Sequence, residues 1–355
     1  QTPPLRCDDP ELLRAMYAGR IPEHFDIEAT RDAESARQMC GFIRRHDPSR
    51  PFFGYLDMRG PHPSYRGWLP WIREYESMDI AVPPKAALSE APWVEQVYRR
   101  TYDLEKMTDD KWVTIVRAYY SAVSFNDMLV GHVLDQLSAS GLAANTIVIY
   151  TADHGDFAGE HGCVEKHDAM LYDCHTHMPL VLQLPEGFGK GRRADCLVEM
   201  IDVAPTLLEL CGFDVPRSMQ AMSFAPVIRG ETSEHKDAVF AEGGVEQEAL
   251  DRLKAADPSE SLQQPSGLYN YKCKVALDYP EMMLRAKMVR TKEHKYIYRL
   301  NGRHEFYDLR SDPVELRNEI ANPSCSEAVE HMRERLMRWL VESETNLPLI
   351  DRPWP

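Results

Sequence analysis

The stretch NTIVIYTADHGDFAGEHGCVEKHDAMLYD, from Asn145 to Asp173, decides the fold class of this chain. It opens with a run of β-branched residues that is typical of a strand, and it continues into a loop crowded with carboxylates, imidazoles and a lysine. A second apolar run, Met178–Gly187, follows and predicts another buried strand. Ionisable side chains directly after a strand indicate a ligand site at the edge of an α/β sheet.

Helical and apolar segments alternate on both sides of this stretch. Helical spacing is found in Ala29–Asp47 and in Lys111–Gly141, which a glycine closes. Between them, Pro51–Met58 predicts a buried strand, and further along Asp202–Gly212 predicts a helix with an aspartate cap. The alternation predicts an α/β fold with a mixed, largely parallel sheet sandwiched by helices.

The chain changes character after Gly230. Short β-rich runs joined by tight turns fill Ala286–Leu309, including the hairpin signal Asn301-Gly302, and an amphipathic helix is predicted for Ser326–Ser343. We therefore expect residues 1–232 to form the α/β domain. Residues 233–355 are expected to form a smaller C-terminal subdomain, an antiparallel sheet plus a helix.

Two segments have no clear periodic pattern. Ser64–Lys111 is punctuated by prolines and rich in tryptophan and tyrosine, which fits either a local mini-core or the wall of a substrate pocket. Glu246–Tyr269 is polar and predicts an exposed insertion.

Composition excludes some partners. The chain has 355 residues, 43% hydrophobic and 27% charged, with a net charge of −15. The acidic balance argues against nucleic acid, but it leaves room for a small anionic substrate at a locally positive site. No apolar run approaches the roughly 18 residues of a membrane span, so no membrane partner is expected. The oligomeric state is not readable from the sequence.

The cysteines bear on the compartment. The eight cysteines contain no CxxC pair, and several fall in apolar runs, so buried free thiols are favoured over a zinc knuckle. The chain has no Asn-x-Ser/Thr acceptor. Together these features favour a reducing, cytoplasmic compartment over a periplasmic or secreted one. The sequence begins without methionine, so the question of a signal peptide stays open.

The ionisable loop suggests chemistry on an anionic ester. Asp153 and His154 follow the strand directly, and a carboxylate with an imidazole can bind a hard divalent cation. Lys166, in the same loop, could neutralise a bound anion. His62, in the proline-rich loop after another predicted strand, could do the same or protonate a leaving group. Converging on one spot, these groups would suit hydrolysis of a sulfate or phosphate ester.

The same residues also have plainer interpretations. A strand followed by Asp-His-Gly is equally compatible with a simple turn. A histidine between prolines is often structural, and a loop lysine is usually solvated. The HExxH helix of zinc peptidases and the GxSxG elbow of serine hydrolases are absent, which disfavours those two classes.

The ordered set of motifs resembles the sulfatase family of the alkaline phosphatase superfamily. RPFFGYLDMRGPHPSY (Arg50–Tyr65) is similar to the family's strand and Pro-His loop, and NTIVIYTADHGDFAGEHG (Asn145–Gly162) to its metal-ligand strand and Gly-Glu-His-Gly turn. EKHDAMLYDCHTHMPLVL (Glu165–Leu182) places Lys166 at the family's sulfate-binding lysine. The Asp-His pairing is similar to iduronate-type and choline-type sulfatases and to phosphonate monoester hydrolases.

The resemblance implies metal-dependent hydrolysis of sulfate esters, a small anionic ester being the substrate. It implies that Asp153 and His154 bind a divalent metal, calcium above all, with manganese or zinc in some relatives. It implies that His62 and Lys166 act on the sulfate as catalytic residues. Further residues are expected in a second shell or in the substrate pocket: Glu160, His161, His167, His175 and His177.

One part of the family pattern is missing. The family's nucleophile is a formylglycine made from a Cys or Ser in a Cys/Ser-x-Pro-x-Arg motif, and two more metal ligands come from an early Asp-Asp strand. HDPSR (His46–Arg50) has histidine in the nucleophile's place, and CDDP (Cys7–Pro10) follows no apolar strand. We find no nucleophile and expect the first strands, about a third of the family pattern, to be absent.

Three readings therefore stay open. We expect a sulfatase whose nucleophile-bearing segment is missing from residues 1–355, so that this polypeptide alone binds metal weakly and does not turn over sulfate esters. The alternatives are a phosphonate or phosphate ester hydrolase of the same superfamily, and a non-catalytic anion-binding pseudoenzyme.

Overall fold

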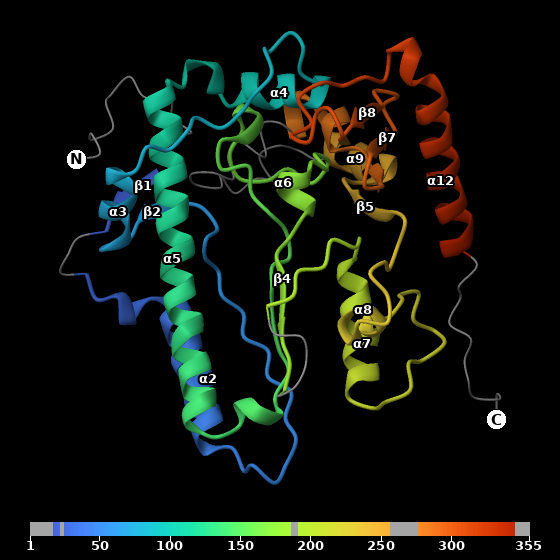
Figure 1. Cartoon of the computed structure of the whole chain (residues 1–355). Helices are drawn as coiled ribbons and strands as arrows, with labels where there is room; N and C mark the ends of the chain where they lie inside the picture. Colours follow the sequence, from blue (N-terminus) through green and yellow to red (C-terminus); the bar gives the residue numbers. More distant parts are fainter. Residues whose placement is uncertain (1–16, 22–24, 186–190, 256–275, 345–355) are drawn as a thin grey trace.

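The computed structural model describes residues 17–21, 25–185, 191–255 and 276–344, which form a mixed α/β structure (Figure 1). The strands are β1 (Tyr17–Arg20), β2 (Tyr65–Gly67), β3 (Val148–Thr151), β4 (Leu180–Gln183), β5 (Val239–Gly243), β6 (Ala286–Arg290), β7 (His294–Arg299) and β8 (Glu305–Asp308). The α-helices are α2 (Arg31–Arg45), α3 (Trp71–Ser77), α4 (Trp93–Thr101), α5 (Asp109–Ala139), α6 (Asp173–Thr176), α7 (Val203–Leu210), α8 (Ala225–Arg229), α9 (Gln247–Ala255) and α12 (Ser326–Glu344).

The two long predicted helices of the first half, α2 and α5, are confirmed and lie side by side (Figure 1). Thr30 caps α2 by accepting a hydrogen bond from the backbone N–H of Ala33 at 3.1 Å, and arginines fill its last turn, where they suit the helix dipole. A second core cluster packs α2, α5 and the segment around β2 together, with Trp68 stacked on Phe125 at 4.1 Å.

The described strands form three small sheets. β1 and β2 pair in parallel, β3 and β4 pair antiparallel, and β5–β6–β7–β8 form an antiparallel sheet in chain order. The mixed α/β class and the smaller C-terminal antiparallel sheet with its closing helix are as predicted. The largely parallel sheet is not directly shown, because only one parallel pair occurs among the described strands.

Two predictions of buried strands are corrected. Pro51–Met58 is extended but pairs with no described strand, and its Phe53 and Tyr55 side chains are 81% and 79% exposed. β4 is a strand as predicted, yet it is not buried, since Val181 is 60% exposed. An apolar run becomes a buried strand only when neighbours supply hydrogen bonds on its edges and cover on both faces. Among the described residues Pro51–Met58 has no strand partner and cover on one face only, where Phe52 packs on Phe42 and Met58 on the second core cluster.

The largest core cluster joins the first half of the chain to the C-terminal sheet. It contains side chains from the 64–112 segment, the ionisable loop, β7 and β8, among them Tyr65, Tyr98, Tyr102, Trp112, Phe157, Tyr172, Ile297 and Tyr307. The tyrosines of Ser64–Lys111 thus belong to the main core of the molecule and not to a separate local core. α3 and α4 form within this segment.

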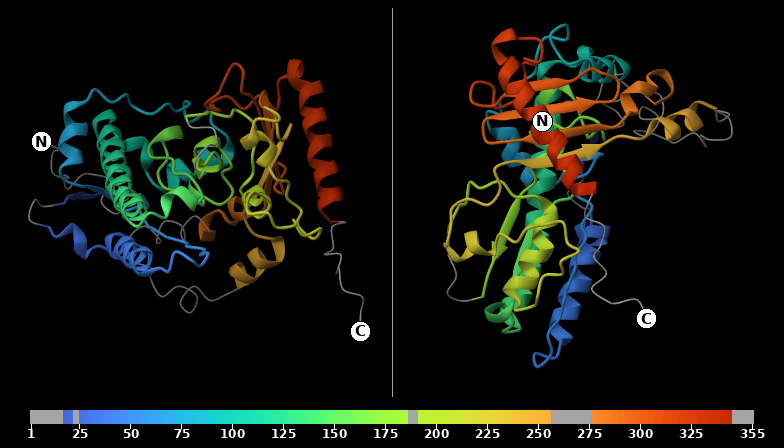
Figure 2. Two further views of the ribbon diagram at one scale, coloured as in Figure 1. Left: turned by 60° about the horizontal axis from the view of Figure 1, so that its bottom comes forward. Right: turned by 90° about the vertical axis from the view of Figure 1, so that its right-hand side faces the viewer.

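The closing helix α12 lies across the strands of the C-terminal sheet (Figure 2). A third cluster holds it there, in which Val329, Met332 and Leu336 of the helix pack against the sheet. Because the main core spans both halves of the chain, the division at residue 232 stays a prediction.

Several sequence features lie outside the described residues. They are the Cys7–Pro10 segment, most of the polar Glu246–Tyr269 insertion, and Cys273. The cysteines that the structure does describe are all free thiols. Within the described ranges, no helix has both the length and the apolar character needed to cross a bilayer.

Candidate anion-binding site

His62 and Lys166, which are far apart in the sequence, meet in the structure. Lys166 Nζ lies 3.1 Å from His62 Nε2, and both side chains are partly accessible, at 23% and 22%. An ammonium group only donates, so His62 Nε2 is the acceptor, and His62 Nδ1 donates to the Pro63 carbonyl at 2.7 Å. His62 is therefore a neutral imidazole that orients the charged Lys166.

The environment of His62 favours this neutral form. Burial lowers the pKa of His62, and the positive charge of Lys166 lowers it further. The hydrogen bond to Pro63 and the carboxylate of Glu165 act in the opposite direction but do not reverse the shift. At neutral pH the pair thus presents one positive charge, carried by Lys166.

The hydroxyl of Tyr65 ties three segments of the chain to this pair. Tyr65 follows His62 closely and begins β2, and its ring is fully buried. Its hydroxyl donates to the Asp156 carboxylate and accepts from the backbone N–H of Glu165 at 2.9 Å. Asp156, the His62–Tyr65 segment and the Glu165–Lys166 segment therefore meet in one place, whereas within the described ranges no hydrogen bond or ion pair joins Asp153 or His154 to the His62–Lys166 pair.

Asp156 is the buried carboxyl of this junction. Burial raises its pKa to about 6, although its hydrogen bonds from Tyr65 and from the backbone N–H of Ala158 oppose the shift. Neither Asp156 nor Tyr65 was predicted from the sequence to be a site residue. The only indication in the sequence was that Asp156 lies close to Asp153, and Tyr65 close to His62, along the chain.

The turn after β3 packs closely against α6. Gly155 donates its backbone N–H to the His175 carbonyl at 2.8 Å, and a Cβ on Gly155 would lie 1.9 Å from the Cys174 carbonyl oxygen. Only glycine fits there, and α6 is thereby fixed beside the end of β3. Asp153 and His154 directly precede this glycine, so the contact also fixes their place.

Asp153 and His154 have donor atoms suited to a cation. His154 Nδ1 donates to the Gly155 carbonyl at 2.7 Å, which leaves Nε2 as the free lone pair, 3.7 Å from Asp153 Oδ2. The Asp153 side chain is 89% exposed and that of His154 is 34% exposed. A carboxylate and an imidazole of this tautomer fit a divalent metal chemically.

The pair does not make a complete metal site by itself. Nowhere in the described ranges do three or more His, Cys, Asp or Glu side chains gather in a way that could hold a metal. Calcium takes six to eight oxygen ligands, and even a zinc site needs about four donors. Asp153 and His154 thus fit part of a metal site, and further ligands would be needed to complete it.

The other predicted site residues are placed elsewhere. His161 is buried, with Nδ1 3.4 Å from Glu95 Oε2 and its ring stacked on Tyr172, beside the half-buried Glu160. His167 is buried, and its Nδ1 accepts from the Ala169 N–H at 3.3 Å. Of the two remaining histidines, His175 is buried, with Nδ1 donating to the Met170 carbonyl at 2.6 Å, and His177 is exposed. His161, His167 and His175 are thus core histidines in this structure.

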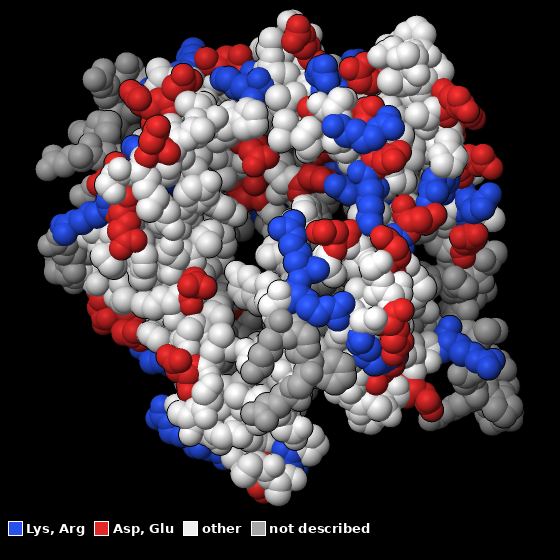
Figure 3. Space-filling view, in the orientation of Figure 1, with Lys and Arg blue, Asp and Glu red and all other residues white. Residues whose placement is uncertain are grey.

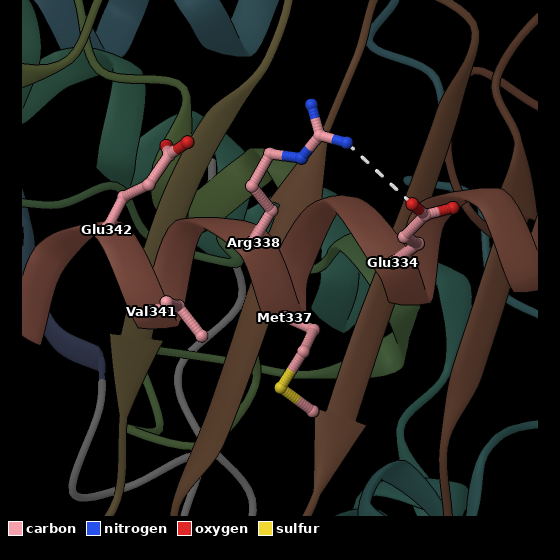
Figure 4. A pocket seen from close by; sticks show the side chains of 5 residues that line it. All are labelled: Glu334, Met337, Arg338, Val341 and Glu342. Atoms are coloured by element: carbon pink, nitrogen blue, oxygen red, sulfur yellow. Dashed lines mark ion pairs between the residues drawn. The ribbon is translucent and has the colours of Figure 1, made fainter.

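Two surface hollows lie away from the predicted residues. One, of about 410 Å³, is lined by side chains of α12, such as Met337 and Val341 (Figure 4). The other, of about 460 Å³, lies between the end of α2 and Phe52. Neither contains a residue that the sequence analysis selected.

Comparison with known proteins places these residues in context. The family model described as Sulfatase matches residues 8–213. The arylsulfatase of Clostridium perfringens is 24% identical over 307 residues, covering 84% of this chain and 55% of that protein. A sulfatase of Formosa agariphila is 29% identical over 307 residues (83% and 52%), and human arylsulfatase K is 27% identical over 310 residues (81% and 52%). The chain spans about half the length of these relatives.

Solved structures show the same fold. The phosphonate monoester hydrolase of Agrobacterium radiobacter superposes with a TM-score of 0.71 at 20% identity, covering 92% of this chain and 63% of that one. A 2-O GAG sulfatase superposes with a TM-score of 0.66 at 22% identity, covering 89% and 64%. At these identities the likeness supports the fold alone.

Proposed function

Because the chain belongs to the sulfatase family, we propose that it carries the sulfate-binding half of a hydrolase of sulfate esters. The observation that carries this proposal is the contact between His62 and Lys166, which the Tyr65 hydroxyl connects to Asp156. A cation and an imidazole brought together from distant segments, partly accessible and backed by buried polar groups, suit recognition of a tetrahedral oxyanion.

Lys166 is the charged partner of the sulfate in this proposal. Its ammonium group can donate to a sulfate oxygen while a second hydrogen goes to His62 Nε2, so the imidazole aims the ammonium at the ligand. Its positive charge balances the negative charge that develops on the ester as the bond to the leaving oxygen breaks. His62 has its own proton committed to Pro63, so Lys166 is the donor toward the substrate.

The family implies a divalent metal, and we propose that Asp153 and His154 supply two of its ligands, with calcium favoured over manganese or zinc. When bound, such an ion stabilises negative charge on the substrate oxygens. The two donors need further ligands, and no Cys/Ser-x-Pro-x-Arg motif occurs in residues 1–355. In this proposal the formylglycine nucleophile and the remaining ligands come from polypeptide outside these residues.

The proposal is tested with two proteins. One is the 355-residue chain, and the other is a longer polypeptide that includes the codons upstream of Gln1, assayed on paired aryl sulfate and aryl phosphonate esters. We expect no turnover by the first and sulfate hydrolysis by the second. In the longer protein, Lys166→Ala lowers kcat by roughly 10²–10³, as loss of one charge-stabilising donor does.

A surface lysine provides the control. Lys292→Ala removes a lysine that pairs with exposed Glu234, and it should leave kcat unchanged. Turnover by the 355-residue chain that is lost on Asp153→Ala would overturn the proposal. A clear preference for the phosphonate ester would favour the phosphonate hydrolase reading, and binding of the esters without hydrolysis by either protein would favour the anion-binding pseudoenzyme.

A further inference from the structure

A third ionisable side chain, Glu165, lies next to the His62–Lys166 pair on the side away from solvent. Its Oε1 atom is 3.5 Å from Lys166 Nζ and 4.0 Å from His62 Nε2. The Glu165 side chain is only 1% exposed, whereas Lys166 and His62 are 23% and 22% exposed. A ligand that reaches the pair from solvent therefore meets the ammonium and the imidazole first, with the carboxylate behind them.

The backbone holds Glu165 in this place. Its φ of 58° is in the left-handed region that non-glycine residues rarely adopt. Its N–H donates to the Tyr65 hydroxyl at 2.9 Å, and its carbonyl accepts from the Phe157 N–H at 2.9 Å. These bonds fix the Glu165 backbone on both sides of the residue, and the carboxylate that it carries is buried within the junction.

Glu165 changes the charge that the site offers to an anion. Lys166 contributes one positive charge, His62 is neutral, and Glu165 contributes one negative charge, so these three groups sum to zero. A buried carboxylate is poorly screened by solvent and salt. It repels a ligand with two negative charges about twice as strongly as a ligand of the same shape with one.

We propose that Glu165 is a specificity-determining residue that makes the site favour singly charged oxyanion esters, such as sulfate monoesters, over doubly charged phosphate monoesters. This inference rests on the proposed function, because it requires His62 and Lys166 to be the anion-binding pair. In this proposal the net charge of the ester determines its affinity, and the identity of the sulfur or phosphorus atom does not. Singly charged phosphonate monoesters should therefore bind like sulfate esters.

Three phenyl esters of similar shape test the inference. Phenyl sulfate and phenyl methylphosphonate carry one negative charge, and phenyl phosphate carries two at about pH 8, above its second pKa. The Kd of each is measured by calorimetric or NMR titration of the 355-residue chain. We expect Glu165→Gln to strengthen phenyl phosphate relative to phenyl sulfate by roughly tenfold, and to leave the phosphonate-to-sulfate ratio nearly unchanged.

Matched variants separate charge from structure. Glu165→Asp keeps the charge and should keep the wild-type ratio, whereas Glu165→Ala removes the charge without the isosteric amide and should shift the ratio as Glu165→Gln does. Asp168→Asn removes a carboxylate from an exposed position of the same loop and should have no effect. A purely structural role for Glu165 would weaken all three ligands together and leave their ratios alone.

The outcomes separate a failure of the inference about Glu165 from a failure of the proposed function. If all three ligands bind but neither Glu165→Gln nor Glu165→Ala moves the phosphate-to-sulfate ratio, the inference is wrong and the proposed function stands. If none of the three binds the unaltered chain, the proposed function is itself contradicted, and the inference is lost with it.

Discussion

At the scale of single residues, the Tyr65 hydroxyl joins two segments of the site by hydrogen bonds. Tyr65 connects Asp156 to Glu165 and begins the strand after the His62 loop. Its ring is fully buried, and its pKa is raised well above its ordinary value by burial and then by the charge of Asp156, so the hydroxyl keeps its proton. It acts as a fixed donor and acceptor rather than as an acid or base.

Replacing Tyr65 with phenylalanine should destabilise the fold and weaken the site together. The change leaves a buried carboxylate and a buried N–H without this partner, which costs about 1–3 kcal/mol in the free energy of unfolding. Urea denaturation measures this loss, and phenyl sulfate titration should show weaker binding. Tyr120→Phe on the exposed face of α5 is the control, with a change below about 0.5 kcal/mol. Equal stability of the two variants would contradict the role of Tyr65.

The pH dependence of stability should reveal the buried His175. Burial is the main cause that lowers its pKa to about 3 from 6.5, against the hydrogen bond that its Nδ1 donates to the Met170 carbonyl. The unfolded chain therefore binds this proton first, so stability is full above about pH 6.5 and is lost as pH falls toward 3.

We expect the contribution of His175 to fall by about 2 kcal/mol between pH 6.5 and pH 4.5. Urea midpoints at the two pH values measure it, and His175→Gln should remove this part of the pH dependence. His177→Gln, at an exposed position of the same segment, serves as the control. An unchanged pH slope in His175→Gln would show that the imidazole is not buried as described.

At the scale of elements, the helices were predictable and the strands only partly so. α5 and α12 have an apolar stripe and polar faces, which local sequence shows directly. The β6–β7–β8 meander was predictable from its alternation and its Asn-Gly turn. Pro51–Met58 has strand composition but no partner in the described structure, and partners are a property of the fold rather than of the segment.

The site, like the strands, was only partly predictable from the sequence. His62 and Lys166 were selected because their residue types suit anion binding, and the structure places them together. Sequence reasoning missed Glu165, although it stands next to Lys166, because a glutamate in a polar loop is ordinarily exposed. The prediction that His161 and His167 belong to a second shell or to the substrate pocket stays a prediction; both are buried, His161 stacked on Tyr172 and His167 edge-on to Tyr98.

The contact between the ionisable loop and the C-terminal sheet depends on a fully buried lysine. Lys295 of β7 is 0% exposed and donates to the Leu171 carbonyl at 3.1 Å and to Asp173 Oδ1 at 2.6 Å. Glu315 Oε1 lies 2.5 Å from the same ammonium. Although burial acts in the opposite sense, Lys295 and Arg290 lower the pKa of Asp173 to about 2.

Lys295→Met should therefore cost about 3–5 kcal/mol in the free energy of unfolding, because the buried Glu315 and the partly buried Asp173 lose a positive partner. Urea denaturation at neutral pH measures the loss. Lys292→Met, in the turn before β7, breaks an exposed pair with Glu234 and should cost less than about 1 kcal/mol. If the two variants are equally stable, the buried network is not what joins the loop to the sheet.

At the scale of the whole molecule, the charges and the apolar surface are unevenly distributed. On the face shown in Figure 3, side chains of both signs gather over the C-terminal sheet and α12, and fewer lie over α5. Large apolar side chains are exposed on the extended segment and on the small sheet, among them Phe53, Tyr55, Tyr150 and Val181. These belong to strand-like segments, whose faces and edges are ordinarily covered in a folded domain.

The placement of the site within the molecule follows from this layout. The main core reaches from the 64–112 segment through the ionisable loop to β8, and the His62–Lys166 pair lies where that core meets the segments that expose apolar surface. The His62–Lys166 pair is thus anchored on one side by a packed core, to which Tyr65 and Val164 belong.

The most direct test of the central claim is an NMR titration of the 355-residue chain with phenyl sulfate, observing ¹⁵N-labelled histidine and lysine side chains. The account predicts that the His62 Nε2 and Lys166 Nζ signals shift together with one Kd, and that Lys166→Ala abolishes the His62 shift while Lys292→Ala preserves it. If the two signals stay unmoved, or move with different dissociation constants, the groups do not share a single oxyanion and the account is wrong.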